Sequence, residues 1–352
     1  MKFMLNTHVP WPESKEPAQV YDEIAEEIQY GEQLGFYSAW LAEHHFSRYG
    51  LAPSQLMLAT KIAAITKTIR LGTAVMVPPL HHPIQLAEEI AMFDQLSGGR
   101  LDIGFGRGSA PYEYNGYNID RDESQARFQE VITIVEGLLT TPDYSYDGRF
   151  YKVHHVNLVP PPVQKPCPPI HIAATRTPAT FDYVTSSGHP IIVGVVLDTV
   201  DALDLCRRFL SKASAAGHSM PISRIPFFRY VYVAESEEEA LRDARRSAEW
   251  TLDMIQWRGS FTAGGSEVYQ HLEDFRRSRT TLPPTFEHIA ERRGFFGTPD
   301  QVAAKIQQVQ GEGIEYFGAT FAFGDLEHEK VMRSMELFAK EVMPRFEAVP
   351  AG

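Results

Sequence analysis

The chain of 352 residues is poor in the features that mark several common classes of protein. It has only two cysteines, Cys167 and Cys206, which supply neither a disulfide framework nor a thiolate metal cluster and are typical of a reducing compartment. No apolar run approaches the length that spans a membrane, and the start of the chain contains no apolar segment of a signal peptide. We therefore predict a soluble, cytoplasmic protein without a membrane-spanning segment.

An excess of positive charge is also absent. The formal net charge is −12, and the sequence contains no block of Lys and Arg and no basic stripe interleaved with aromatic residues. Proteins that bind the phosphate backbone of nucleic acids need such a basic surface. The sequence therefore argues against nucleic-acid binding, although a local basic spot for a small anionic cofactor remains compatible with it.

Three common catalytic signatures are missing as well. The first predicted strand is followed by His8 to Pro12 instead of the glycine-rich turn of a dinucleotide-binding fold. The 13 histidines include no His-x-His or His-Glu-x-x-His spacing that would direct two rings at one metal ion. There is also no Gly-x-Ser-x-Gly motif. We predict neither a metal site nor a serine nucleophile of that type.

What the sequence does contain is a regular alternation of short apolar strands and amphipathic helices. Strands are expected at residues 2–7, 37–42, 70–77, 101–106, 169–174, 190–196, 227–234 and 316–323. Helices are expected at residues 17–34, 54–65, 84–96, 123–139, 178–187, 200–216, 236–255, 299–310 and 327–342. Residues 144–158 are expected to form an inserted hairpin with its turn at Asp147-Gly148.

About eight strands that alternate with helices, without a composition shift that marks a linker, favour a single α/β domain over residues 1–352. We predict a (β/α)8 TIM barrel, with a doubly wound open sheet as the alternative. One long irregular insertion, near residues 258–292, breaks the alternation. We expect it to be a mobile loop over the mouth of the barrel, where the active sites of such barrels lie; the alternative is a solvated surface excursion.

The first candidate site follows the second predicted strand, which leads directly into Glu43, His44 and His45. Because side chains alternate along an extended chain, one ring of the pair is expected to face the barrel mouth while the other packs or orients a neighbour. Histidine exchanges protons near neutral pH, so the pair is a candidate for general acid–base catalysis. The alternative is two rings that only hydrogen-bond at the barrel rim.

A second candidate site combines Arg107, after the strand at 101–106, with Arg176, Thr177 and Thr180 at the start of the helix at 178–187. Guanidinium groups, hydroxyls and the N–H groups of a helix N-terminus together bind phosphate. We therefore expect a phosphate site at this end of the barrel. For Thr177 the alternative is ordinary capping of its helix.

Motifs along essentially the whole chain resemble those of the bacterial luciferase-like flavin monooxygenases, most closely the luciferase α-type subunit. They are Glu43-His44-His45-Phe46, Thr73-Ala74-Val75, His82-Pro83, Gly98-Gly99-Arg100, Arg107-Gly108, Gly297-Thr298-Pro299, Met335-Glu336-Leu337-Phe338 and Val342-Met343-Pro344. The resemblance implies a (β/α)8 barrel that binds reduced FMN across its mouth. It also implies that dioxygen adds to the flavin to give a flavin 4a-hydroperoxide.

The resemblance further implies residue roles. His44 matches the family's catalytic histidine, a general acid or base, and His45 matches its supporting neighbour; Glu43 beside them is a third candidate catalytic residue. Ala74-Val75 matches a non-proline cis peptide that supports the flavin ring. Residues 258–292 match a mobile loop that shields the reactive intermediate.

The phosphate site of the family matches Arg107, Thr177 and Thr180, but the chain departs from the family nearby. Gly106 replaces a reactive cysteine, and Gln125 replaces a second phosphate arginine. Arg127 lies two residues further on, about 200° around a helix, so it is not expected to take that role. Arg176 is the expected replacement cation.

The leading hypothesis is an FMN-dependent monooxygenase that uses reduced flavin and O2 to oxygenate a small, mostly apolar organic molecule. Because the chain lacks a nicotinamide fingerprint, we expect a two-component system with a separate flavin reductase. Small apolar positions on the helices at 54–65 and 84–96 predict a homodimer or a heterodimer with a related chain. Two alternatives remain: a deazaflavin-dependent hydride-transfer enzyme, or a non-catalytic flavin-binding partner subunit.

Overall fold

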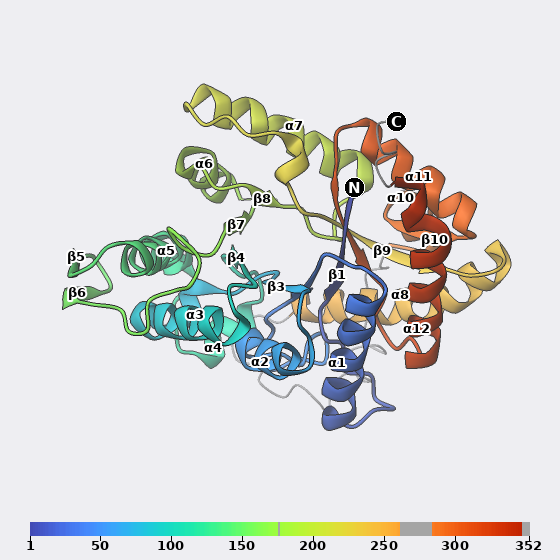
Figure 1. Cartoon of the computed structure of the whole chain (residues 1–352), viewed down its shortest axis with the longest axis horizontal. Helices are drawn as coiled ribbons and strands as arrows, with labels where there is room; N and C mark the ends of the chain where they lie inside the picture. The colour runs from blue at the N-terminus through green and yellow to red at the C-terminus, as the bar shows by residue number, and fades with distance from the viewer. Residues whose placement is uncertain (175–176, 261–283, 347–352) are drawn as a thin grey trace.

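Parallel strands occupy the middle of the computed structural model, and helices lie around them (Figure 1). The structure describes residues 1–174, 177–260 and 284–346. The strands of the main sheet are β1 (Lys2–Thr7), β2 (Ser38–Leu41), β3 (Arg70–Thr73), β4 (Leu101–Gly106), β7 (Ile170–Ala173), β8 (Ile191–Ile192), β9 (Phe227–Val233), β10 (Gly294–Gly297) and β11 (Tyr316–Thr320). Their order is β10-β9-β11-β1-β2-β3-β4-β7-β8, and every pairing in it is parallel.

The sheet closes on itself. Val193, directly after β8, forms a parallel bridge with Phe227 at the start of β9. Two backbone hydrogen bonds hold the bridge: the Val193 N–H donates to Pro226 O at 3.0 Å, and the Phe228 N–H donates to Val193 O at 2.9 Å. All strands of the sheet except β10 therefore form one ring, with β10 added beside β9. The predicted (β/α)8 barrel is confirmed.

The helices begin and end at the local signals that their sequence supplies. They are α1 (Pro17–Gln33), α2 (Gln55–Ile65), α3 (Pro83–Ser97), α4 (Pro111–Gly116), α5 (Ser124–Thr140), α6 (Pro178–Ser187), α7 (Thr199–Ala215), α8 (Glu237–Ser260), α10 (Phe286–Arg292), α11 (Pro299–Gly311) and α12 (His328–Leu337). The Ser54 hydroxyl caps α2 by accepting the Met57 N–H at 3.3 Å, and Thr298 and Gln301 form a capping box at α11. Gly98 ends α3 with a φ of +67°, which glycine adopts without strain. Within residues 1–174, 177–260 and 284–346, no helix combines the length and apolarity needed to cross a membrane.

The hairpin predicted at 144–158 is confirmed: β5 (Tyr144–Asp147) and β6 (Lys152–Val156) pair antiparallel and lie beside α5 at the edge of the molecule (Figure 1). Other predicted bounds were wrong. The strand expected at 70–77 ends at Thr73, and the one expected at 190–196 is reduced to Ile191–Ile192. The helix expected at 327–342 is α-helical only to Leu337 and continues as a π-helical turn, Phe338–Val342.

The region near residues 258–292 is also more regular at its ends than predicted. The helix α8 continues to Ser260, and α10 occupies Phe286–Arg292 before β10 begins. The predicted mobile loop otherwise falls on residues 261–283, which lie outside the described residues. The strand β10 was missed because Gly294-Phe295-Phe296-Gly297 is short and bounded by glycine, a pattern typical of a turn.

Large side chains fill the interior of the barrel. The Trp40 ring meets Phe228 with 5.8 Å between centroids and His171 edge-to-face at 5.5 Å. Gly72 makes room for this indole, since a Cβ at Gly72 would lie 2.3 Å from Trp40 Cδ2. Because the interior is packed, chemistry is confined to the rim where the strands end.

Candidate active site

The predicted site residues that the structure describes lie along one rim of the barrel. Leu41 at the end of β2 pairs in register with Thr73 at the end of β3, and Gly106 at the end of β4 pairs with Ala173 at the end of β7. The segments that follow these strands carry Glu43–His45, Ala74-Val75, Arg107 and Thr177. Arg176, the expected replacement cation, lies outside the described residues.

The two adjacent histidines occupy different surroundings, as the alternation of side chains predicts. The His44 ring meets Tyr49 edge-to-face with centroids 4.8 Å apart and stacks with His8 at 6.0 Å. The His45 ring is buried and packs edge-to-face on Tyr117 at 5.0 Å. Only His44 therefore turns toward the residues at the end of β1.

Glu43 is fully buried behind His45 and binds three groups. Its Oε1 lies 2.8 Å from His45 Nε2 and 2.9 Å from His81 Nε2, and its Oε2 accepts the Val77 N–H at 3.1 Å. Burial alone would raise the pKa of this carboxyl, but the charge of His81 and hydrogen bonds from His45 and His81 lower the pKa to about 2. Glu43, a candidate catalytic residue from sequence, is thus placed to hold two imidazoles in position.

A second carboxylate, Glu113 of α4, fixes the histidine pair from the other side. Its Oε1 lies 3.4 Å from His44 Nδ1 and accepts the His45 N–H at 3.2 Å. When Nδ1 carries the proton that Glu113 accepts, a neutral His44 ring has its lone pair on Nε2. Sequence reasoning missed this residue because α4 is a helix of six residues, and its one local signal is Pro111 at a helix start.

Arg107 joins the first turns of two helices. Its Nη1 donates to Ser124 Oγ of α5 at 2.8 Å, and its Nη2 donates to Thr177 Oγ1 at 3.0 Å. Thr177 stands at the N-cap of α6, yet its side chain makes no capping hydrogen bond to that helix. Simple capping, the alternative interpretation of Thr177, is therefore not what the structure shows.

The same cluster contains a buried donor that lacks a partner. The Thr180 hydroxyl donates to Gln125 Oε1 at 2.6 Å, while Gln125 Nε2 is buried and makes no hydrogen bond to any described residue. Arg127 turns away, because it pairs with Glu123 at 2.8 Å and stacks on Phe150. A guanidinium, hydroxyls, an amide N–H in need of an acceptor and two helix N-termini fit the phosphate of a mononucleotide.

Ala74 and Val75 are joined by a non-proline cis peptide bond, as the resemblance implies. The Val75 carbonyl accepts a hydrogen bond from Gln55 Nε2 at 2.9 Å. A Cβ on Gly106 would lie 2.3 Å from Val75 Cγ2. The side chain of Val75 thus occupies the space that a cysteine side chain at position 106 would need. A glycine at position 106 is therefore compatible with a valine at position 75.

The Glu43–His81 pair predicts a pH-dependent contribution to stability. Burial alone would lower the pKa of His81, but the charge and hydrogen bond of Glu43 raise the pKa above its usual value of 6.5. Stabilisation by a raised pKa is complete below pH 6.5 and is lost as the pH rises through the folded-state pKa. Replacing His81→Gln should therefore lower the free energy of unfolding by about 2 kcal/mol at pH 6, and by less at pH 8.5.

Urea unfolding at the two pH values measures this difference. His155→Gln is the matched control, because His155 pairs with Asp143 at 3.2 Å on the surface, where such pairs contribute little. A loss of stability in His81→Gln that stays constant from pH 6 to 8.5 would contradict a protonated His81 in the folded protein.

No group of three or more His, Cys, Asp or Glu side chains is arranged to hold a metal ion among residues 1–174, 177–260 and 284–346.

Comparison with known proteins gives a family assignment. The sequence model of the luciferase-like monooxygenase family matches residues 1–316. The chain belongs to the luciferase-like monooxygenase family.

Relatives within and around this family support the assignment. The chain is 28% identical to the oxygenase component of a flavin-dependent trigonelline monooxygenase from Acinetobacter baylyi, over 98% of this chain and 96% of the relative. The crystal structure of the monooxygenase RslO1 from Streptomyces bottropensis matches with a TM-score of 0.85 and 29% identity, covering 99% of this chain and 100% of the other. As a luciferase-like monooxygenase, the protein is an oxidoreductase.

The fold also occurs in an enzyme that depends on coenzyme F420, whereas the trigonelline monooxygenase is flavin-dependent. A coenzyme F420-dependent tetrahydromethanopterin reductase from Methanopyrus kandleri matches with a TM-score of 0.73 and 20% identity, covering 98% of this chain and 99% of the other. At this level of identity the likeness concerns the fold alone. The choice of cofactor therefore has to be argued from the residues at the rim of this luciferase-like chain.

Proposed function

We propose that this chain is the oxygenase component of a two-component, FMN-dependent monooxygenase that oxygenates a small organic substrate. The observation that carries the proposal is the cluster of Arg107, Ser124, Gln125, Thr177 and Thr180, which offers a cation and an unpaired buried N–H to one phosphate group. The trigonelline monooxygenase component, similar over nearly the whole chain, supports the oxygenase role.

Three parts of the rim would divide the work. Arg107 and its neighbouring hydroxyls bind the phosphate, and the segment Ala74-Val75 supports the ring system of the cofactor. Reduced FMN, when bound, supplies the electrons that activate dioxygen. His44, oriented through Nδ1 by Glu113, holds or moves a proton at Nε2, while His45 stays fixed between Glu43 and Tyr117.

Water must be kept from a reaction of this kind, and the described residues supply an apolar cover. Trp250, Met254 and Trp257 of α8 form a buried cluster with Tyr49 and Tyr112 next to the histidines. Trp257 and Tyr112 lie 5.7 Å apart between ring centroids. This cover excludes solvent from the side of His44 and thereby strengthens the electrostatic interactions there.

The reaction with dioxygen tests the proposal. Stopped-flow mixing of the protein–reduced FMN complex with O2 should show a transient absorbance distinct from reduced and oxidised FMN, with a longer lifetime than free reduced FMN shows. Oxidation of the bound cofactor in one phase, at the rate of the free cofactor, would contradict an oxygenase. Titration against a reduced deazaflavin is the companion measurement, because far tighter binding of the deazaflavin would favour the hydride-transfer alternative.

We also propose that a separate flavin reductase supplies the reduced FMN, that the protein is cytoplasmic, and that residues 1–352 form one domain.

We further propose that the chain associates with a second copy through α2 and α3. These two helices lie side by side (Figure 1) and expose Met57, Ile65, Met92 and Leu96. Exposed apolar side chains on neighbouring helices are typical of a protein–protein contact. Light scattering that gives the mass of one chain at micromolar concentration would contradict the association.

A further inference from the structure

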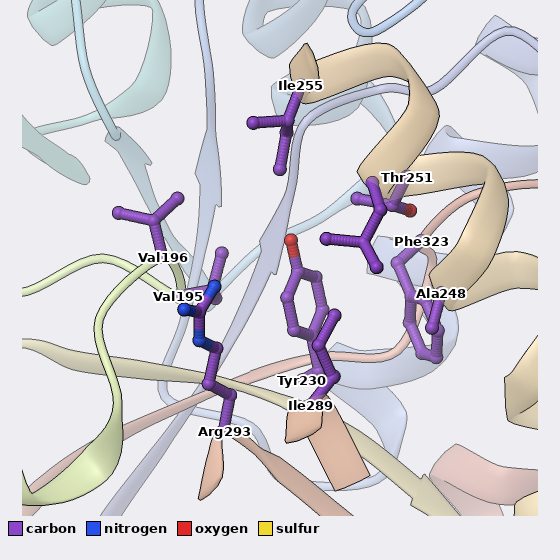
Figure 2. A pocket seen from close by; sticks show the side chains of 10 residues that line it. Val195, Val196, Tyr230, Ala248, Thr251, Ile255, Ile289, Arg293 and Phe323 are labelled. Atoms are coloured by element: carbon purple, nitrogen blue, oxygen red, sulfur yellow. The ribbon is translucent and has the colours of Figure 1, made fainter. Parts of the chain in front are cut away.

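A pocket near the carboxyl end of β9 has largely apolar walls. It lies between the segment after β8, the strand β9, and the helices α8 and α10. Val195, Ile255, Ile289 and Phe323 supply apolar walls (Figure 2). The space enclosed by these side chains is about 10 Å³, room for one water, so a larger ligand requires them to move apart. On such apolar walls, the polar groups of Tyr230 and Arg293 stand out as specificity elements.

The first polar group is the Tyr230 hydroxyl. Tyr230 stands in the middle of the pocket with its hydroxyl directed toward Ile255 (Figure 2). The side chain is only 4% exposed, and its oxygen lies near Tyr49 but makes no hydrogen bond of normal geometry to any described residue. Burial raises the pKa of Tyr230 well above 10, and the nearby Tyr49 adds to the shift, so the phenol is neutral and can donate. A buried donor without a partner is costly unless a ligand accepts its proton.

The second polar group is the guanidinium of Arg293, which lies on the other side of the pocket beside Val195 (Figure 2). Its Nε donates to Asp198 Oδ1 at 2.7 Å, and His288 Nε2 lies 3.0 Å from the same oxygen. Burial alone would raise the pKa of Asp198, but the hydrogen bonds from Arg293 and His288 hold it below its usual value. Among the described residues, Arg293 is held through Nε by Asp198, and its Nη1 and Nη2 donate to no side chain or carbonyl; this edge of the guanidinium lines the pocket.

The pocket is continuous with the histidine side of the rim. Tyr230 and Phe323 also line a neighbouring hollow that His8 and Tyr49 border. Tyr49 in turn packs edge-to-face on His44. A molecule held at Tyr230 would therefore extend toward the ring to which we assign the proton chemistry.

We propose that this pocket is the substrate subsite and that it selects a mostly apolar molecule with an anionic oxygen, a carboxylate, bound between the Tyr230 hydroxyl and the Arg293 guanidinium. An anion suits this position because a half-buried guanidinium interacts more strongly with a charged acceptor than with a neutral one. The inference rests on the proposed function, since it assigns the substrate of the same site.

Binding measurements test the inference without turnover. Isothermal titration of the full chain, saturated with oxidised FMN so that the phosphate cluster is occupied, compares benzoate and 1-naphthoate with their neutral amides. The carboxylates should bind at least about tenfold more tightly than the amides. Tyr230→Phe removes only an unpaired hydroxyl, so it should fold normally and weaken carboxylate binding about tenfold.

Two arginine variants separate charge from fold. Arg293→Gln should abolish the preference for carboxylate over amide. Arg293→Lys keeps a positive charge that can pair with Asp198, so it should fold and should retain part of the preference. Tyr146→Phe in the hairpin and Arg207→Gln, whose arginine pairs with Glu312 on the surface, are the matched controls and should bind like the unaltered chain.

Equal affinity for carboxylates and amides, no measurable carboxylate binding, unaltered carboxylate binding in Tyr230→Phe, or an unaltered preference for carboxylates in Arg293→Gln would each overturn the subsite. Failure of the proposed function is distinguished from this by the FMN step. If FMN does not bind, the same titrations on the FMN-free chain still report on Tyr230 and Arg293. If FMN binds and the carboxylates do not discriminate, only the subsite is wrong.

Discussion

Replacing His44→Ala should abolish coupled oxygenation of substrate while reduced FMN still binds. The ring lies apart from the phosphate cluster, and its Nδ1 is oriented by Glu113, which leaves proton exchange to Nε2. Loss of a positioned acid or base lowers rates by about 10² to 10⁴. The measurement is the fraction of reduced FMN oxidation that yields oxygenated product from a substrate found by screening, beside an FMN affinity from fluorescence titration.

Two variants show whether position or chemistry is lost. Glu113→Gln keeps an acceptor oxygen for His44 Nδ1 but removes the charge, so it should lower the coupled rate by less than His44→Ala and shift its pH profile. Tyr117→Phe, which removes the hydroxyl 3.2 Å from His45 Nδ1, should leave the chemistry intact because His45 remains bound to Glu43. Full coupling in His44→Ala would exclude an acid–base role and would favour a non-catalytic flavin-binding subunit.

The parts of the fold that could be predicted from sequence are those set by local patterns. The bounds of β1, β4 and α6 were predicted to the residue, because a strand between polar turns and a helix that begins with Pro178 are fixed by neighbouring residues. The π-helical turn at Phe338–Val342 could not be predicted, since the sequence there keeps a helical pattern.

The same division holds for the site. The different surroundings of His44 and His45 follow from the alternation along an extended chain, so one sequence sufficed. The role of Ser124 and the unpaired hydroxyl of Tyr230 depend on contacts between segments far apart in the chain. Hydroxyl side chains are common, and nothing local distinguishes the one that meets Arg107.

Replacing Arg107→Gln should weaken FMN binding by about 10- to 100-fold and leave riboflavin binding nearly unchanged. Riboflavin shares the ring system of FMN and lacks the phosphate, so the ratio of the two affinities isolates the phosphate interaction. Arg107 is the only described cation that donates to both Ser124 and Thr177, and hydrogen bonds to charged groups contribute about 1.5 to 3 kcal/mol. Fluorescence titration with both compounds measures the ratio.

Two further measurements test whether Arg107 acts through its charge: the dependence of FMN affinity on ionic strength, and the FMN affinity of a control variant at a neighbouring arginine. FMN affinity of the unaltered chain should fall with ionic strength, and that of Arg107→Gln should fall less, because one cation no longer faces the phosphate. Arg127→Gln is the control. Arg127 lies in the first turn of α5, as Ser124 does, but it pairs with Glu123 and stacks on Phe150, so its replacement should leave the FMN affinity unchanged. If Arg107→Gln kept the full preference for FMN over riboflavin, the phosphate would have to bind elsewhere, and the cluster around Gln125 would need another ligand.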